Sequence, residues 1–408
     1  MAERSGAGVE NVLVVSTWFP HPLDNGSRVR AHHLLRQLSG RYRVTLATFG
    51  TSDEASAPGP LDALASRVVV VPPARSASMP LGPRGLLSRV PRHYLQSDSA
   101  QMHDTVRHLL PGQDVAVALQ VDAARYLAGH DGIPKVFDEV EVTVFREQYE
   151  RARRLLRVRH GLTWWKFRRF TASLVDAFDQ STAVSAKERD EIIGIGCDPD
   201  RVSVVPNGVS VDLAGEPAMR VPRLVYPGSV LFAANLDAVR YFVRDVLPRL
   251  RERRPDLELV VTGATGGVDI TELMRPGVRF TGRLDDVEPF VAESAVCVVP
   301  LRIGGGTRLK VLQAMALGTP VVSTTKGIEG LDVAADRHVL VADEPGAFAT
   351  AVMRLLDDDA LHRRISDEAR TLMSDRYGWR TIADSLDAVI HRAVDRHRRR
   401  GDAAPRLG

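Results

Sequence analysis

The sequence predicts an α/β protein with two domains, each built on a doubly wound parallel sheet. Short apolar runs typical of buried parallel strands alternate along the chain with stretches of helical periodicity. The chain has 408 residues, too many for one ordinary core, and two alternating sets flank a segment containing Gly215 and Pro217. We therefore expect an N-terminal domain over 1–213, a C-terminal domain over 222–378, and a C-terminal helix with a basic tail over 379–408.

The apolar runs predict the strands of both sheets, and helical stretches lie between most of them. In the N-terminal domain, strands are expected at 11–17, 44–49, 68–71, 115–119, 135–137, 181–184 and 202–205. In the C-terminal domain, strands are expected at 223–226, 257–262, 278–280, 296–299, 320–323 and 339–341. We also expect a helix at 235–251 and a helical tail from about 345 to 400. The segments 51–66 and 72–100 are rich in Ala, Ser, Pro and Gly, which predicts loops or lids.

The composition describes a soluble globular protein, with 44% hydrophobic and 26% charged residues. A net charge of +3 is too small to imply a nucleic-acid partner. Cys197 and Cys297 lie in unrelated segments without metal-ligand spacing, which favours a reducing compartment without disulfides. No apolar run approaches the length of a membrane span. We therefore expect a cytoplasmic protein.

The stretch 296–323 carries the strongest functional signal. A short apolar run, Val296–Val299, is followed by the three glycines Gly304–Gly306 and by a helical pattern that begins at Arg308. The glycines let the backbone approach a ligand closely, and the helix start offers free N–H groups to an anion. Arg308 and Lys310 place two positive charges in the first turn, where they oppose the helix dipole unless an anion faces them. We interpret this stretch as a phosphate site; the alternative is a tight turn whose charges face solvent.

A weaker version of the same pattern occurs near the N-terminus. There, a predicted strand and a proline-rich loop lead to Gly26, Ser27 and Arg28 at the start of a helix. Gly26 allows a left-handed turn, and Ser27 is a plausible N-cap. A capped surface helix explains these residues equally well. The absence of a Gly-x-Gly-x-x-Gly motif disfavours a nicotinamide or flavin dinucleotide site.

Two groups of acidic residues have both a functional and a structural interpretation. Asp138, Glu139 and Glu141 lie just past a predicted strand end, where doubly wound sheets bind ligands, so they could position a substrate hydroxyl or stabilise positive charge. They could equally be dipole partners at a helix start. The run Asp357–Asp359 resembles a metal-binding cluster but falls between two predicted helices, so we interpret it as a solvated acidic turn.

The segment 151–170 is basic and aromatic. It carries eight Arg or Lys and no acid, together with two tryptophans and two phenylalanines. This composition is typical of a helix that contacts a membrane surface or an acidic partner. However, Trp164 and Phe167 fall opposite the stripe formed by Leu155, Val158, Leu162 and Trp165, so the helix is imperfectly amphipathic. A packed helix with a solvated basic flank is the interpretation that we favour; peripheral membrane contact stays open.

Several stretches, read together, resemble the family-4 glycosyltransferases over nearly the whole chain. They are Phe19-Pro20 with Asn25-Gly26-Ser27-Arg28, Val204–Val209, Ala234–Asp237 with Tyr241-Phe242, Gly282–Val287 and Gly305–Ala316. The last stretch, with its Gly-Gly-Gly-Thr-Arg-Leu-Lys motif, is similar to a bacterial branch of the family. The resemblance implies a GT-B architecture, in which two Rossmann-like domains face a cleft and a C-terminal helix returns to the first domain. It also implies sugar transfer from a nucleotide-diphosphate donor to an acceptor hydroxyl, with retention of configuration and without a metal.

The resemblance also implies roles for individual residues. Arg308 and Lys310 would hold the diphosphate, with Gly304–Gly306 beneath the sugar. The turn Gly282–Leu284 would border the base, and Gln313 would face the ribose. The catalytic candidates are Arg308, Lys310, Asp138 and Glu141. The donor-binding candidates are Gly26, Ser27, Arg28, Gly228, Ser229, Asn235, Gly282, Arg283, Leu284, Gly304, Gly305, Gly306, Thr307, Leu309 and Gln313.

The sequence departs from the family pattern at several of its polar positions. The glutamate pair of the family falls on Gly305 and Gln313, so neither carboxylate is present. The arginine and lysine that usually follow the first strand of the second domain fall near Ser229 and Asn235. No histidine marks the usual site in the first domain, where Gln120 lies close by. We therefore expect Arg308 and Lys310 to supply the missing positive charge.

We expect a retaining glycosyltransferase. The sugar, the base and the acceptor are not predicted, and saccharide, lipid-linked and natural-product acceptors all stay open. Within the same fold, a nucleotide-sugar epimerase is an alternative. A different class is a non-catalytic scaffold or regulator that binds nucleotide, which the loss of both glutamates would favour. The oligomeric state is not predicted.

Overall fold

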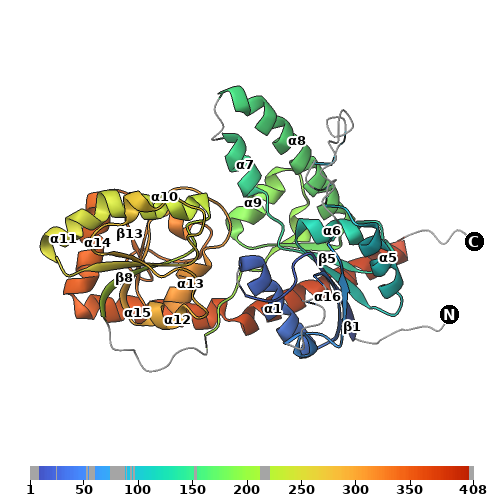
Figure 1. The fold of residues 1–408 in the computed structure, drawn as a ribbon. Helices are drawn as coiled ribbons and strands as arrows, with labels where there is room; N and C mark the ends of the chain where they lie inside the picture. The colour runs from blue at the N-terminus through green and yellow to red at the C-terminus, as the bar shows by residue number, and fades with distance from the viewer. Residues whose placement is uncertain are drawn as a thin grey trace, which may run out of the picture. The chain divides into compact units, whose positions relative to one another are not determined.

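The computed structural model describes residues 9–23, 25–51, 54, 60–73, 88, 90–91, 94, 97–150, 154–211 and 221–403. The chain divides into two compact units. In Figure 1 one is coloured from blue to green and also contains the red C-terminal helix, and the other runs from yellow to orange-red. Unit 1 comprises Met1–Pro206 and Ile382–Gly408, and unit 2 comprises Asn207–Thr381. The division thus falls between Pro206 and Asn207, whereas the expected linker at 213–221 lies almost entirely outside the described residues.

Unit 1 is built on a seven-stranded parallel sheet in the order β3-β2-β1-β4-β5-β6-β7. Its strands are β1 (Asn11–Ser16), β2 (Arg43–Phe49), β3 (Arg67–Val71), β4 (Val115–Leu119), β5 (Lys135–Asp138), β6 (Gln180–Ala183) and β7 (Val202–Val204). Its helices are α1 (Gly26–Ser39), α5 (Ala100–Leu109), α6 (Gln120–Ala128), α7 (Thr143–Glu150), α8 (Arg154–Ala177) and α9 (Ala186–Gly194), with 3-10 turns at Pro60–Ala63 and Pro199–Arg201. The predicted strands are confirmed, each to within one residue at either end.

The strands of unit 1 are buried on both faces, because helices cover both sides of the sheet. Successive side chains of a strand point to opposite faces. Leu13 and Val15 of β1 belong to the core formed with α5, α6 and α8. Leu34 and Leu35 of α1 are also fully buried, and α1 packs on β2. This two-sided burial explains why the strands read as continuous apolar runs in the sequence.

Unit 2 is built on a six-stranded parallel sheet in the order β10-β9-β8-β11-β12-β13. Its strands are β8 (Val221–Pro227), β9 (Glu258–Thr262), β10 (Val278–Phe280), β11 (Ser294–Val299), β12 (Val321–Ser323) and β13 (Leu340–Val341). Its helices are α10 (Ala233–Tyr241), α11 (Leu247–Arg253), α12 (Glu288–Ala292), α13 (Leu309–Ala316), α14 (Pro345–Asp357) and α15 (Asp359–Leu372), with 3-10 turns at Thr271–Leu273 and Lys326–Ile328. The predicted strands are again confirmed, each to within two residues at either end.

Two π-helical segments interrupt the helices of unit 2. Phe242–Val246 joins α10 to α11, so the helix predicted at 235–251 is one continuous run with a π turn inside it. Met373–Tyr377 follows α15 and leads to the last helix, α16 (Trp379–Ala403). Helices α10, α11 and α14 lie on one side of the sheet, and α12, α13 and α15 lie on the other (Figure 1).

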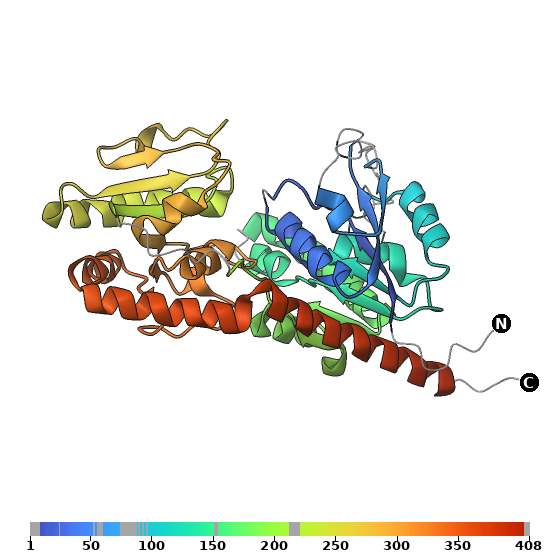
Figure 2. The ribbon, with the colours of Figure 1, turned by 90° about the horizontal axis from the view of Figure 1, so that it is seen from below.

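Helix α16 begins in unit 2 and completes unit 1, along which it runs in Figure 2. Its apolar face is buried, with Leu386, Val389 and Ile390 fully excluded from solvent. Polar contacts add to this packing: the Tyr42 hydroxyl donates to Asp387, and Arg396 donates to Asp198 at 2.9 Å. The expected return of the C-terminal helix to the first domain is confirmed.

The sheet orders place a topological switch point in each unit. In unit 1 the connections reverse direction between β1 and β4, and in unit 2 between β8 and β11. Ligands of doubly wound folds bind outside the carboxyl ends of the strands at such points. These two edges are therefore where a functional site is expected. Among the described residues, no helix combines the length and apolarity needed to cross a bilayer.

Candidate active site

The switch point of unit 2 is formed by the glycine loop that follows β11. Gly304 and Gly306 have φ values of +102° and +77°, a left-handed conformation that favours glycine. A Cβ at Gly304 would also lie 3.1 Å from the Cβ of Ala234, so the loop packs closely against the start of α10. Helix α13 begins at Leu309, which makes Arg308 its N-cap residue rather than a member of the first turn.

Lys310 lies in the first turn of α13, and its amine points at the end of β8. The Nζ atom donates to the Tyr226 hydroxyl at 2.9 Å and to Asn235 Oδ1 at 3.0 Å. It also lies 4.0 Å from the centre of the Tyr226 ring. None of these partners is a carboxylate, so no counter-ion offsets the cost of burying the charge. Burial consequently lowers the pKa of Lys310 to about 7.

The loop after β8 is shaped around this amine. A Cβ at Gly228, where φ is +156°, would lie 2.6 Å from Lys310 Nζ, so a larger residue here would displace the amine from this position. Asn235 Nδ2 donates to the Ser229 carbonyl at 2.8 Å, which holds the amide with its oxygen toward Lys310 and Tyr226. Ser229 Oγ in turn donates to the Ala264 carbonyl at 2.8 Å. Gly228, Ser229 and Asn235 are thus brought together with Lys310.

Arg308 is buried, and its side chain binds the backbone of the glycine loop. Its guanidinium donates to the carbonyls of Gly305 at 2.5 Å and Gly304 at 2.7 Å, and more weakly to the Lys326 carbonyl at 3.4 Å. The sequence predicts Arg308 as a diphosphate ligand equivalent to Lys310; that role stays a prediction, and these contacts add a structural one. In the structure, Arg308 fixes the glycine loop, and Lys310 supplies the amine at the switch point.

The remaining donor candidates of unit 2 are dispersed around this edge. Thr307 Oγ1 accepts from Asn207 Nδ2 at 2.8 Å, and Leu309 packs on the core. Gly282 has a φ of +72°, and its carbonyl accepts from Gly263 N at 2.9 Å; Arg283 beside it is exposed and Leu284 is half-buried. These contacts position the loops and do not identify a ligand.

Gln313 lies one helical turn beyond Lys310 and is paired with an acid. Its Nε2 donates weakly to Glu288 Oε1, at 3.5 Å. Glu288 is the first residue of α12, and burial together with the charge of Asp286 raises the pKa of its carboxyl. Gln313 occupies the position of the second glutamate of the family, and the Glu288 carboxyl group lies next to its amide. Glu288 is not among the residues predicted from the sequence, because it lies 25 residues before Gln313.

The switch point of unit 1 brings together Ser27, Gln120 and Glu139. Gln120 Nε2 donates to Ser27 Oγ at 2.6 Å and to Glu139 Oε2 at 2.7 Å. Gln120 and Glu139 follow β4 and β5 directly and have φ values of +72° and +59°. Among the described non-glycine residues, only Asp336 shares this left-handed conformation. Such strain is concentrated at functional sites, where surrounding contacts hold it in place.

Asp138 is fully buried and has a structural contact for both of its oxygens. Arg30 donates to Oδ2 from Nε at 2.8 Å and to Oδ1 from Nη2 at 2.7 Å, and Thr182 Oγ1 donates to Oδ1 at 2.6 Å. Arg30 also donates to the Pro206 carbonyl at 2.9 Å. We therefore withdraw Asp138 from the catalytic candidates. Glu141, the other acid proposed there, is half-buried two residues beyond Glu139.

The start of α1 differs from its prediction. Asn25, and not Ser27, is the N-cap: its side chain accepts from Arg28 N at 3.0 Å. Gly26 is the first helical residue rather than a left-handed turn. The Arg28 side chain donates to the His21 carbonyl at 3.1 Å. Ser27 is thereby left to bond Gln120, whereas Gly26 and Arg28 build the helix start.

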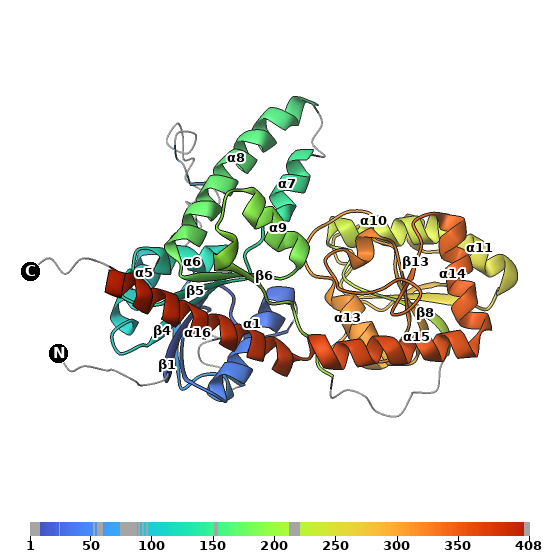
Figure 3. The same cartoon turned by 180° about the vertical axis from the view of Figure 1, so that it is seen from behind.

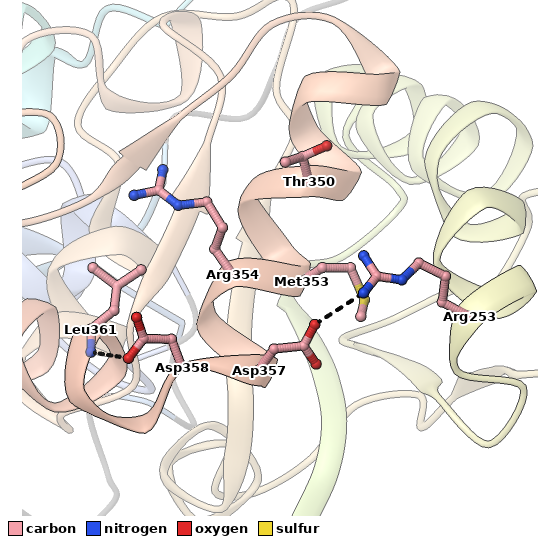
Figure 4. A pocket seen from close by; sticks show the side chains of 7 residues that line it. All are labelled: Arg253, Thr350, Met353, Arg354, Asp357, Asp358 and Leu361. Atoms are coloured by element: carbon pink, nitrogen blue, oxygen red, sulfur yellow. Dashed lines mark hydrogen bonds and ion pairs between the residues drawn. The ribbon is translucent and has the colours of Figure 1, made fainter.

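A shallow pocket elsewhere in unit 2 does not coincide with any of these groups (Figure 4). It has a volume of about 350 Å³ and lies between the end of α11 and the turn from α14 to α15. Asp357 contacts Arg253 and Arg254 at 3.4 Å, and Asp358 caps α15 by accepting from Leu361 N at 2.9 Å. The acidic turn thus serves the fold. In the part of the chain that the structure describes, no cluster of His, Cys, Asp or Glu is arranged to hold a metal.

The chain is similar to several glycosyltransferases. It is 30% identical to the D-inositol 3-phosphate glycosyltransferase of Paenarthrobacter aurescens over 239 residues, which cover 53% of this chain and 58% of that protein. It is 32% identical to the glycogen synthase of Mycobacterium tuberculosis over 253 residues, which cover 57% of this chain and 58% of the synthase. The alignments thus span well under two thirds of the length of these curated relatives.

The fold has close counterparts among solved structures. The crystal structure of Anabaena HepE in complex with UDP superposes with a TM-score of 0.64 and 15% sequence identity, covering 94% of this chain and 99% of HepE. At this identity the likeness shows the fold, which is the GT-B arrangement of two parallel-sheet domains. Residues 24–213 match the sequence model described as Glycosyltransferase Family 4, and residues 221–358 match the one described as Glycosyl transferases group 1. The two switch points described above therefore belong to a member of the family-4, group 1 glycosyltransferases.

Proposed function

We propose that this protein is a retaining glycosyltransferase. It moves a sugar from a nucleotide-diphosphate donor to the hydroxyl of a saccharide, lipid-linked or natural-product acceptor. The observation that carries the proposal is the amine of Lys310, held at the switch point of unit 2 by Tyr226 and Asn235 without a carboxylate partner. A buried amine in a neutral cage gains most from a ligand that brings negative charge, and a diphosphate does so.

The position of Lys310 supports the charge substitution that the sequence predicts. Asn235 stands near the place of a family cation, and Lys310 Nζ is 3.0 Å from its side-chain oxygen. The Lys310 amine thus reaches the place of the family cation near Asn235, although Lys310 itself lies 75 residues further along the chain. When the glycosidic bond breaks, the diphosphate gains negative charge, so a lysine at this point stabilises the transition state more than the ground state. Because this charge comes from the protein, we propose that transfer requires neither a metal nor a cofactor.

We assign the base and the ribose of the donor to another part of the unit 2 site, away from Lys310. HepE was solved with UDP, which makes a uridine diphosphate sugar the first donor to test. Glu288 and Gln313 together offer a carboxylate and an amide, the groups that bind paired ribose hydroxyls. Gly282 and Leu284 would border the base.

The acceptor hydroxyl is assigned to unit 1. Ser27, Gln120 and Glu139 form a half-buried polar group at the switch point, suited to hydrogen bonding with a sugar hydroxyl. The Arg30–Asp138 pair beneath them fixes the backbone at Glu139. We further propose a cytoplasmic location, where its two buried free cysteines would stay reduced.

A thermal-shift panel of UDP, GDP and dTDP and their sugars tests the proposal. A nucleotide at a hundred times its Kd stabilises the protein by about 2.7 kcal/mol, which is readily measured. The responding nucleotide sugar is then incubated without acceptor, and slow release of free sugar shows transfer to water. Binding without turnover of any donor would instead support a nucleotide-binding scaffold, and conversion to a second nucleotide sugar would support an epimerase.

A further inference from the structure

Helix α8 presents one face to unit 1 and another to solvent. Together with α7, its N-terminal part extends away from the sheet of unit 1 (Figures 1 and 3). On the inner face, Phe167 is buried and stacks on Phe145 at 4.0 Å, and Leu174 and Val175 are buried further along the helix. These residues account for the aromatic side chains that disturb the amphipathic pattern in the sequence.

The outer face of α8 carries an exposed apolar stripe, formed by Val158, Leu162 and Trp165. Their exposed fractions are 81%, 43% and 40%. With Arg169 they occupy positions i, i+4, i+7 and i+11, which fall within about 60° of one another around a helix. The Arg169 guanidinium lies 5.2 Å from the centre of the Trp165 ring. Apolar residues aligned in this way along an exposed helix face indicate a surface that binds something.

Arginines border the stripe on both sides. Arg157 and Arg168 lie on one flank and Arg159 on the other, and all three are exposed. The segment 151–170 contains eight Arg or Lys and no acid. A second copy of this chain placed on the stripe would bring like charges together, which disfavours self-association. An anionic surface with an apolar layer beneath it complements both features.

We propose that the outer face of α8 docks on the surface of an anionic lipid bilayer. Val158, Leu162 and Trp165 enter the boundary between head groups and acyl chains, while the flanking arginines contact the lipid phosphates. The helix lies in the plane of the surface and does not span it. This inference does not depend on the proposed function, because it rests on a helix outside both switch points.

Sedimentation of the full-length protein with vesicles tests this inference. We expect binding to vesicles of phosphatidylglycerol and phosphatidylcholine that weakens as salt rises, and little binding to pure phosphatidylcholine. Leu162→Gln should lower the partition coefficient at least severalfold, because it removes apolar contact. The double variant Arg159→Gln/Arg168→Gln should lower it about fivefold for each arginine removed.

Matched variants in unit 2 separate this face from the general basicity of the chain. Met274 is exposed and apolar, and Arg363 and Arg380 are exposed cations. Met274→Gln and Arg363→Gln/Arg380→Gln should therefore bind vesicles like the unmodified protein. Equal losses for the two double variants, or no binding to anionic vesicles at low salt, would overturn the proposal.

Discussion

Lys310 shows how a single side chain acquires its chemistry from its surroundings. Its partners, Tyr226 and Asn235, are neutral, and burial lowers its pKa to about 7. In a cage of this kind, the charge of the amine depends on whether an anion is present. Two measurements follow from this one residue.

The first concerns catalysis. Lys310→Met should lower kcat on the order of a hundredfold, the scale of removing one donor that stabilises developing charge. The melting temperature at pH 7 should stay equal or rise, because the variant no longer buries an amine without a counter-ion. Steady-state kinetics and a thermal melt of both proteins measure the two effects. Full turnover in the variant would place the diphosphate elsewhere.

The second concerns pH. Only the protonated amine attracts the diphosphate, and a pKa of about 7 means that the protonated fraction falls as pH rises through 7. The Kd of a nucleotide sugar should therefore increase about thirtyfold between pH 6 and pH 8.5, since the competent fraction decreases by that factor. Titration calorimetry across this range measures it. In Lys310→Met this pH dependence should vanish; an unchanged slope in the variant would assign it to another group.

At the scale of elements, the loops at the switch points are held by buried polar contacts. Arg308 holds the glycine loop, and Arg30 joins β5 to the end of β7 through Asp138 and Pro206. Removing one member of a buried pair leaves an uncompensated charge, which is more costly than the net worth of the pair. Loss of Arg308 should therefore also disturb the glycine loop that its guanidinium holds.

Asp138→Asn should therefore lower the free energy of unfolding by about 3 kcal/mol, because it strands the buried Arg30 guanidinium. Urea unfolding followed by circular dichroism provides the value. Asp190→Asn, which alters an exposed acid of the same unit, serves as the control and should change stability by less than about 0.5 kcal/mol. A stable Asp138→Asn protein without activity would restore Asp138 to the catalytic candidates.

The sequence predicts the elements better than the contacts between them. Every strand is recovered, because strands buried on both faces leave unbroken apolar runs. The glycine loop and Lys310 are found from local spacing. Arg30 and Glu288 are not selected as site or support residues, since their partners lie 108 and 25 residues away in the chain. Glu139 is noted at a strand end, but its contact with Gln120, 19 residues away, is not predicted. Likewise, the N-cap of α1 goes to Asn25 because two capping residues compete there, and pattern alone does not rank them.

At the scale of the whole molecule, α16 is a single helix that begins in unit 2 and continues into unit 1. It leaves unit 2 at Thr381 and fills a buried face of unit 1 with Leu386 and Ile390. Leu386→Ala should destabilise the protein by about 2–5 kcal/mol, the cost of a cavity in a packed core. Arg392→Ala, at an exposed position of the same helix, is the control. Unfolding by heat compares the two; equal melting temperatures would show that α16 is dispensable for unit 1.

The path of α16 also has a consequence for how the protein is made. Unit 1 contains residues that are translated before unit 2 and, with Ile382–Gly408, residues that are translated after it. Domains generally fold during synthesis from the N-terminus onward. Here the nascent first domain must wait, with the α16 surface uncovered, while the 175 residues of Asn207–Thr381 are translated. Unit 2 is continuous and can finish first, so unit 1 is begun before unit 2 and completed after it.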